Sequence, residues 1–516
     1  MKKRTFNTGT VQHALRLLAA GSALALLSAC VSFQGIQSQA QLKTLTADSG
    51  GFPDQGGNAA WPDSTWATTI GGAELQALID TALANNPSLQ VAAARLRAAQ
   101  AMSSLVGANE KPTVTLNGES TYQRFTEHGL VPPPLAGTYE SNNQISFNAS
   151  YELDFWGKHS AEMRSALSQE KVAEAEGQSV RLMLSNAIAR AWLQMARQYA
   201  QLELSKQQLA VREQFDNLTR QRVAAGLDTK SDTQQSLIQL SSLKNDIAQW
   251  QEAIALTRNQ IAALQGLGPE QGKLIATPQF RQVTDSALPG KLPLELLGRR
   301  PDIVAARWRV EAGQGDIDVA KTQFYPNINL VGFAGLSSLG LSNLAKAGSG
   351  IIGVGPSLHL PIFEGGRLRA QLKGKVAAYD IAVATYNQSL TDALHEVADQ
   401  VQILQASQAQ LVEQRSAEQA ARVSLQLAQQ RQKVGTANKL PVLAAESAVL
   451  AQQKTSLELA VRHTEAQINL IKALGGGYKT DAATSPAASQ ASNKADNKIK
   501  NTSVNTTAAN TSEAAS

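Results

Sequence analysis

An internal duplication restricts the fold of this 516-residue chain more than any other feature of its sequence. Segments 86–88 and 112–116 match segments 300–302 and 326–330 at an offset of 214, and Gly157, Gly226 and Lys230 match Gly366, Gly435 and Lys439 at an offset of 209. The offset changes once, so five residues were gained or lost between Leu116 and Gly157. We expect a surface loop there, and two copies of one structural unit overall.

Each copy has the pattern helix, two strands, long helix, turn, helix. Apolar residues recur at helical spacing in 72–108 and 302–324, and the period falls to two in the hairpin regions at about 113–155 and 327–363. Tracts without proline follow at about 158–225 and 367–434. A helix of roughly 65 residues is close to 100 Å long at about 1.5 Å per residue. Gly226 and Gly435 mark the expected helix turns, because a turn needs a permissive backbone, and shorter helices follow to about 264 and 474.

These patterns divide the chain into six segments. We expect a signal peptide (1–29), a lipidated extended segment (30–70), repeat 1 (71–268), an inter-repeat linker (269–298), repeat 2 (299–477) and a disordered tail (478–516). The tail consists largely of Ala, Ser, Thr, Asn and Lys and has no aromatic residue after Tyr478, which favours disorder.

The N-terminus has the pattern of an export signal. A basic start precedes an apolar run from Ala14 to Leu27, and the sequence Leu27-Ser28-Ala29-Cys30 then resembles a bacterial lipoprotein box. Cys30 is the only cysteine, which makes it the candidate lipidation site and excludes a disulfide framework. Val31 stands where an Asp would resemble the inner-membrane retention signal, so the outer membrane is favoured. The alternative is an ordinary signal peptide with an incidental cysteine.

The net charge gives little support to nucleic acid binding. The chain carries a formal charge of +5, but Lys2, Lys3, Arg4 and Arg16 lie in the first 29 residues, which contain no acid. Without them the charge falls to +1, and the main argument for a basic binding surface is lost.

The strand pattern distinguishes two kinds of sheet only in context. In the first copy, apolar residues alternate with polar ones, as in a soluble sheet with one wet face or in a membrane barrel with a polar interior. The chain has an export signal and no apolar run of 18 residues after Cys30, and closed barrels are the other way to cross a bilayer. Two chains would supply eight strands, whose interior is filled by side chains, whereas three would supply twelve. We therefore predict a mixed α/β membrane protein, with a trimeric 12-stranded outer-membrane barrel continued by a long periplasmic α-helical barrel.

Several motifs together resemble the TolC-type outer membrane efflux proteins, in particular their NodT-like lipoprotein branch. They are Leu27-Ser28-Ala29-Cys30, Tyr151-Glu152-Leu153-Asp154-Phe155-Trp156-Gly157-Lys158, Leu297-Gly298-Arg299-Arg300-Pro301-Asp302-Ile303, Phe324-Tyr325-Pro326-Asn327-Ile328 and Leu360-Pro361-Ile362-Phe363-Glu364-Gly365-Gly366-Arg367. The resemblance covers about 30–477 and implies a homotrimer in the outer membrane that docks on a periplasmic adaptor and an inner-membrane pump. It implies a passive exit duct for drugs or other small toxic compounds, without a cofactor or metal.

The resemblance also assigns roles to particular residues. In related proteins leucine and aspartate near the helix turns close the periplasmic end, which implies a gate of Leu440, Leu443, Asp228, Asp232 and Glu446. Ala444 departs from the family pattern, because an acid often follows the second leucine. From the strand pattern itself we expect membrane-interface aromatics at Phe155, Trp156, Tyr325 and Phe363, or else packing residues at the strand-to-helix junctions. The acids near the turns have the alternative role of helix caps.

Other functions have less support in the sequence. His395-Glu396 lacks the second His of a zinc-peptidase motif, since Asp399 stands there, and no P-loop or nucleophile elbow is present. We therefore expect no enzyme. Arg300-Pro301-Asp302 is expected to begin a helix and to form structural ion pairs. A periplasmic adaptor or a structural envelope lipoprotein is the alternative, but an adaptor would have one helical hairpin instead of two matched copies.

Overall fold

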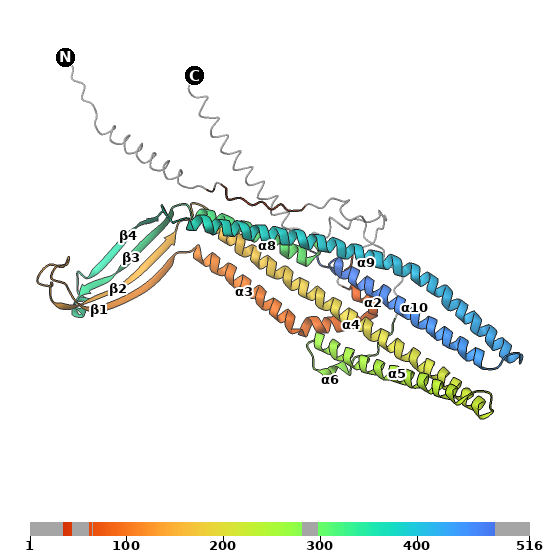
Figure 1. Cartoon of the computed structure of the whole chain (residues 1–516). Helices are drawn as coiled ribbons and strands as arrows, with labels where there is room; N and C mark the ends of the chain where they lie inside the picture. The colour runs from red at the N-terminus through yellow and green to blue at the C-terminus, as the bar shows by residue number, and fades with distance from the viewer. Residues whose placement is uncertain (1–32, 34, 44–60, 64, 281–297, 480–516) are drawn as a thin grey trace, which may run out of the picture. The chain divides into compact units, whose positions relative to one another are not determined.

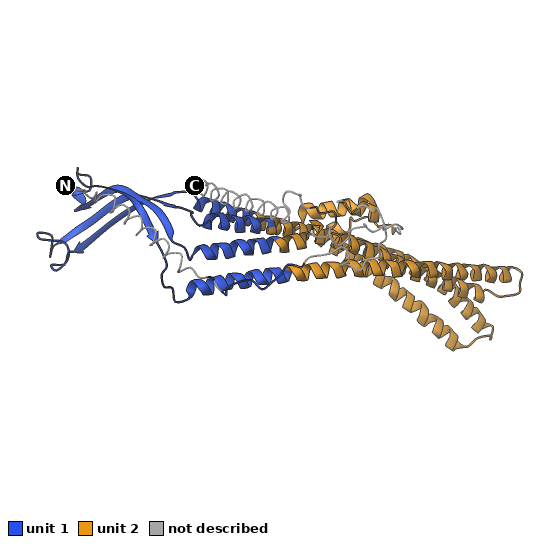
Figure 2. Cartoon of the chain, turned by 90° about the horizontal axis from the view of Figure 1, so that it is seen from above, with its two compact units in different colours: residues 1–42, 97–171, 308–385 blue, residues 43–96, 172–307, 386–516 orange. Residues whose placement is uncertain are grey.

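The computed structural model describes residues 33, 35–43, 61–63, 65–280 and 298–479. The signal peptide, Cys30 and the tail from 480 onward lie outside the described residues. The chain forms two compact units (Figure 2), each assembled from three separate stretches of sequence. Unit 1 contains the strands, and unit 2 contains both turns between long helices.

Unit 1 contains one antiparallel sheet of four strands in the order β1-β2-β3-β4 (Figure 1). The strands are β1 (Thr113–Arg124), β2 (Tyr139–Glu152), β3 (Asn327–Leu339) and β4 (Gly350–His359). Each repeat contributes one hairpin, and β2 pairs with β3, so the two hairpins form a continuous sheet. The connection 125–138 is longer than its counterpart 340–349, which contains only a short 3₁₀ turn, η2 (Leu341–Asn343). The change of offset in the duplication therefore falls within the hairpin, where a loop was expected.

The long helices match in length between the repeats. Both α4 (Lys158–Ala224) and α9 (Arg367–Lys433) contain 67 residues. They are followed by α5 (Lys230–Leu264) and α10 (Leu440–Ala473), and the helices before the hairpins are α3 (Pro87–Asn109) and α8 (Pro301–Thr322). The predicted pattern of four strands and long helices is confirmed.

The helix predicted for 72–108 is wrong in its continuity, because two helices occupy this region. The first, α2 (Trp66–Asn85), ends at Asn86, whose extended conformation (ψ 125°) precedes the proline that begins α3. A residue before proline is pushed out of the helical region by the proline ring, which explains the break. The segment 30–70 is likewise not extended throughout, because α2 begins at Trp66 and continues through a non-helical Gly72 (φ 68°). The linker also begins with a short helix, α6 (Pro269–Gly272).

Each unit has its own packing core. In unit 2, side chains of α2, α4, α5 and α10 form the larger cluster, which contains Trp66, Leu75, Ile188, Trp192, Ile261 and Ile468. In unit 1, Ile36 of the N-terminal segment is buried with Ile317 of α8 and Leu372 of α9. Asp316 of α8 accepts hydrogen bonds from Ser165 of α4 and from Lys375 of α9, so polar contacts also join these helices.

Within the described residues, no helix is both long enough and apolar enough to cross a membrane.

Candidate functional site: sheet faces, strand–helix junction and helix turns

The strand register separates the sheet into two faces of different chemistry. Thr115 of β1 lies opposite Asn148 of β2, and Glu119 lies opposite Gln144; we call this side the polar face. Leu116 lies opposite Phe147 on the other side, the apolar face, which continues through β4. The side chains of the apolar face are largely exposed within one chain, with Ile352 at 87% and Val354 at 80%. A soluble protein rarely leaves a continuous apolar surface of this kind exposed, so the apolar face needs a nonaqueous neighbour.

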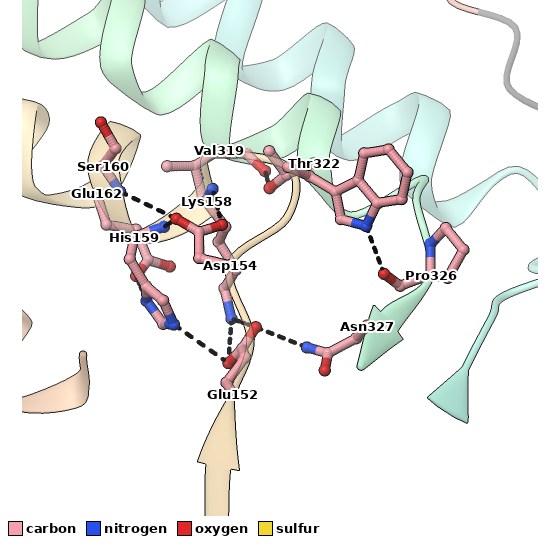
Figure 3. Close-up of polar contacts among 11 residues, drawn as sticks. Glu152, Asp154, Lys158, His159, Ser160, Glu162, Val319, Thr322, Pro326 and Asn327 are labelled. Carbon is pink, nitrogen blue, oxygen red and sulfur yellow. Dashed lines mark hydrogen bonds and ion pairs between the residues drawn. The ribbon is translucent and has the colours of Figure 1, made fainter. Parts of the chain in front are cut away.

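The chain passes from β2 into α4 through a hydrogen-bonded junction (Figure 3). Asp154 caps the helix, because its carboxylate accepts hydrogen bonds from the backbone N–H groups of Lys158 (2.7 Å) and His159 (3.0 Å). The Glu152 carboxylate accepts from the Lys158 ammonium at 2.9 Å and from the Asn327 amide at 2.7 Å. These contacts hold the end of β2 against the start of β3 and fix the direction in which α4 begins.

The four predicted interface aromatics fall into two groups at this end of the sheet. Trp156 stacks on Tyr325 with ring centroids 4.8 Å apart, and its indole N–H donates to the Pro326 carbonyl at 2.7 Å. Phe155 and Phe363 are 63% and 91% exposed. Trp156 and Tyr325 therefore pack against each other, although Trp156 is still 46% exposed, while Phe155 and Phe363 are largely exposed within one chain. The interfacial role of all four stays a prediction.

The arginine motif before α8 forms a structural ion cluster in unit 2. The Arg300 guanidinium donates to Asp302 (2.7 Å), to Glu396 of α9 (2.8 Å) and to the Ala473 carbonyl at the end of α10 (3.1 Å). Lys472 forms a second ion pair with Glu396 at 2.9 Å. Arg300 therefore ties together three helices, as expected for structural ion pairs.

The first helix turn uses its two predicted gate acids in local contacts. The Arg222 guanidinium donates two hydrogen bonds to Asp228, at 2.7 and 2.8 Å, and these lower the pKa of the Asp228 carboxyl. Asp232 forms a reciprocal capping box with Thr229, whose hydroxyl hydrogen bond lowers the pKa of Asp232. Both acids therefore carry a negative charge at neutral pH, and both also stabilise the turn. Gly226 adopts φ 72° between them and α4.

The second helix turn differs in composition and burial. Gly435 adopts φ 76°, and Leu440 and Glu446 are half-buried at the start of α10. Leu443 is only 1% exposed, so its side chain is buried within one chain. Burial of Leu443 argues against a direct place for this side chain in a constriction, whereas Leu440 is partly exposed within one chain.

Sequence reasoning missed Arg222 as the partner of Asp228. The two residues are separated by a turn and lie six positions apart, outside the three- and four-residue spacings that predict pairs on a helix. Among the described residues, no group of three His, Cys, Asp or Glu side chains is placed to hold a metal ion.

The sheet and helices have the architecture of known outer membrane channels. The sequence model of the family "Outer membrane efflux protein" matches residues 78–267 and 292–476, one match for each repeat. The crystal structure of the outer membrane protein VceC from Vibrio cholerae resembles this chain with a TM-score of 0.74 at 37% identity, covering 81% of this chain and 100% of VceC.

Two sequence relatives point to the same class. The multidrug resistance outer membrane protein MdtP of Escherichia coli (strain K12) is 30% identical over 430 residues, which are 82% of this chain and 88% of MdtP. The fusaric acid resistance protein FusA of Burkholderia cepacia is 37% identical over 319 residues, a match that spans 61% of this chain and 60% of FusA.

The chain therefore belongs to the outer membrane efflux protein family. It is an outer membrane channel of an efflux system, and the prediction that it is not an enzyme is confirmed by its family. Channels of this family are trimeric parts of tripartite efflux pumps and protrude into the periplasm.

Proposed function

We propose that three copies of this chain close a twelve-stranded barrel whose apolar face contacts lipid and whose polar face lines a pore. One observation carries the proposal: in the described chain the sheet ends at β1 and β4, each with one unpaired edge, and its apolar face is exposed. An exposed edge strand leaves a row of backbone donors and acceptors without partners. Pairing β4 of one copy with β1 of the next would remove every edge while keeping the antiparallel order.

We propose that Cys30 carries the lipid anchor. The support is the sequence Leu27-Ser28-Ala29-Cys30 together with the position of Phe33, three residues later. The Phe33 ring packs edge-on against Phe324 at 5.1 Å, directly before the proposed interface aromatic Tyr325. Three residues of extended chain reach about 10 Å, so acyl chains on Cys30 would enter the bilayer close to the strand–helix junction.

The proposed activity is passive export of drugs or other small toxic compounds. The names of the relatives, multidrug resistance for MdtP and fusaric acid resistance for FusA, support this class of substrate. Energy would come from an inner-membrane transporter, with a periplasmic adaptor between the two, and the helix turns at Gly226 and Gly435 would meet the adaptor.

We propose that the periplasmic end is closed at these turns. Leu440 would narrow the channel sterically, Asp228 and Asp232 would supply negative charge, and Glu446 would add to it from the second turn. Rings of acidic side chains favour cations over anions. Leu443 would act indirectly, because its side chain is buried within one chain and stabilises the start of α10.

The test is the molar mass and single-channel conductance of the detergent-extracted lipoprotein in planar bilayers. Trimers with a small, mostly closed conductance are expected, and monomers without conductance would refute the channel proposal. Radiolabelled palmitate should enter the wild type and be lost in Cys30→Ser. Equal labelling of both proteins would refute the anchor while leaving the channel in place.

A further inference from the structure

The second hairpin does not alternate as cleanly as the first, and the register shows what this means. Val331 and Phe333 of β3 lie opposite Ser150 and Asn148 of β2, so both fall on the polar face. Ile351 of β4 lies on the same face, because it pairs with Gly335. The polar face of the first hairpin, by contrast, carries Thr, Asn, Gln, Ser and Glu side chains throughout.

The ring of Phe333 lies over Gly353, in space that a side chain at position 353 would fill. Phe333 is paired with Gly353 of β4, and a Cβ added at Gly353 would lie 2.6 Å from two atoms of the ring. Any larger residue at 353 would therefore push the ring away from the strand. Gly355 stands opposite Val331 and leaves open space beside it, since nothing lies within 4 Å of its own Cβ position.

These apolar side chains remain accessible. Phe333 is 44% exposed and Val331 is 40% exposed within one chain. Both lie on inner strand β3, which already has β2 and β4 as neighbours, so pairing of β1 and β4 between copies would not cover them. If the polar face lines the pore, an apolar surface that includes an aromatic ring faces water in a mostly polar wall.

We propose that Phe333, with Val331 and Ile351 beside it, forms a contact site for aromatic organic solutes, above all aromatic cations, as they pass through the barrel. The inference rests on the proposed function, because it requires the polar face to line the pore. An exposed ring face attracts another aromatic ring by stacking and a cation through its quadrupole. The trimer would present three such sites, which would slow an aromatic solute without closing the route to small ions.

The experiment measures block of single-channel current by tetraphenylphosphonium, with tetraethylammonium as the cation that lacks aromatic rings. Phe333→Leu keeps an apolar side chain of similar volume but removes the ring. The matched control is Phe147→Leu, which makes the same change on the apolar face of the neighbouring strand. The three proteins should have equal conductance in the absence of blocker.

Phe333→Leu should weaken block by tetraphenylphosphonium about three- to tenfold, which is the range expected for loss of one stacking or cation–π contact. Block by tetraethylammonium should not change, and Phe147→Leu should behave as the wild type. Equal affinity for tetraphenylphosphonium in Phe333→Leu and wild type would overturn the site, as would an equal loss in Phe147→Leu. Absence of any conductance in the wild type would instead refute the proposed function, and the contact site with it.

A second variant tests the same site by a change at Gly353 instead of Phe333. Gly353→Ala places a methyl group where the ring lies, so the ring must move away from β4. Gly355→Ala is its control, because open space surrounds that position. Only Gly353→Ala should change the affinity for tetraphenylphosphonium. The same affinity in both variants would contradict the placement of the Phe333 ring over Gly353.

Discussion

Replacement of Arg300 by Met tests whether the ion cluster before α8 holds unit 2 together. Met has a similar reach but no charge, and it would remove the donors that now serve Asp302, Glu396 and the Ala473 carbonyl. The Arg300 side chain is only 10% exposed, and Glu396 is 28% exposed. Loss of one partner from a buried ion pair costs about 3–5 kcal/mol. Asp302 is 46% exposed and partly screened by water, so we expect about 2–4 kcal/mol here.

The same cluster predicts a pH dependence. Burial alone would raise the pKa values of Asp302 and Glu396, but hydrogen bonds from Arg300, and from Lys472 to Glu396, bring both below their ordinary values of 3.8 and 4.5. A carboxyl group with a lowered folded-state pKa contributes stability above its unfolded pKa and loses that contribution as the pH falls through its folded pKa. The stability difference between wild type and Arg300→Met should therefore be complete at pH 7 and shrink below pH 4.5.

The assay is urea unfolding of the detergent-solubilised protein, followed by helical circular dichroism. Urea is preferred because guanidinium, as a salt, would screen the ion pairs. Arg190→Met is the matched control: Arg190 forms one ion pair with Glu465 of α10 at 2.9 Å, with the two side chains 54% and 40% exposed. An exposed pair of this kind contributes about 0–1 kcal/mol. Equal shifts of the urea midpoint in the two variants would refute the reasoning about burial.

Five further substitutions, at four positions, have distinct expected results. Leu440→Ala should raise the leak conductance of a stable trimer in planar-bilayer recording, and unchanged leak in a trimeric protein would contradict the gate. Leu443→Ala removes a side chain that is 1% exposed, so the urea midpoint should show a free energy of unfolding lower by about 2–5 kcal/mol. Gly435→Ala should lower the free energy of unfolding by about 1–2 kcal/mol, because φ at this position is 76°. Gly435→Asn should lower it less in the same assay, since Asn tolerates this conformation, and equal losses would contradict the backbone argument. Burial lowers the pKa of His463, so the folded state resists its protonation and stability should fall as the pH drops below 6.5. His463→Gln should reduce the difference between urea midpoints measured at pH 7 and pH 5. An equal difference in the variant and the wild type would rule out His463 as the cause.

The long helices could be predicted because single residues mark where they begin and end. Lys158 and Arg367 follow strand patterns closely, Gly226 and Gly435 end the helical tracts, and the observed α4 and α9 end within one residue of the expected limits. The break at Asn86 was missed because apolar spacing continues across it, although Pro87 was present as a signal.

The side chains near the turns were harder to predict. The helices have no wide apolar stripe, so the sequence does not tell whether Leu443 is buried within one chain, as observed, or exposed. Likewise, the pairing of β2 with β3 joins residues almost 200 positions apart, which no local pattern can indicate. The break in alternation at Phe333 was visible in the sequence, but its face could be assigned only from the strand register.

The equal length of α4 and α9 limits how this protein can change during evolution. An insertion of one heptad into either helix alone would move its turn by about 10 Å along the axis relative to its counterpart. Both turns must reach one partner if they dock together, so insertions in the two helices would have to arise as compensated pairs. The hairpin connections 125–138 and 340–349 already differ in length, so they are not required to keep an equal number of residues. Sequence drift and length variation should therefore accumulate at the hairpin end, while the two helical arms keep a common residue count.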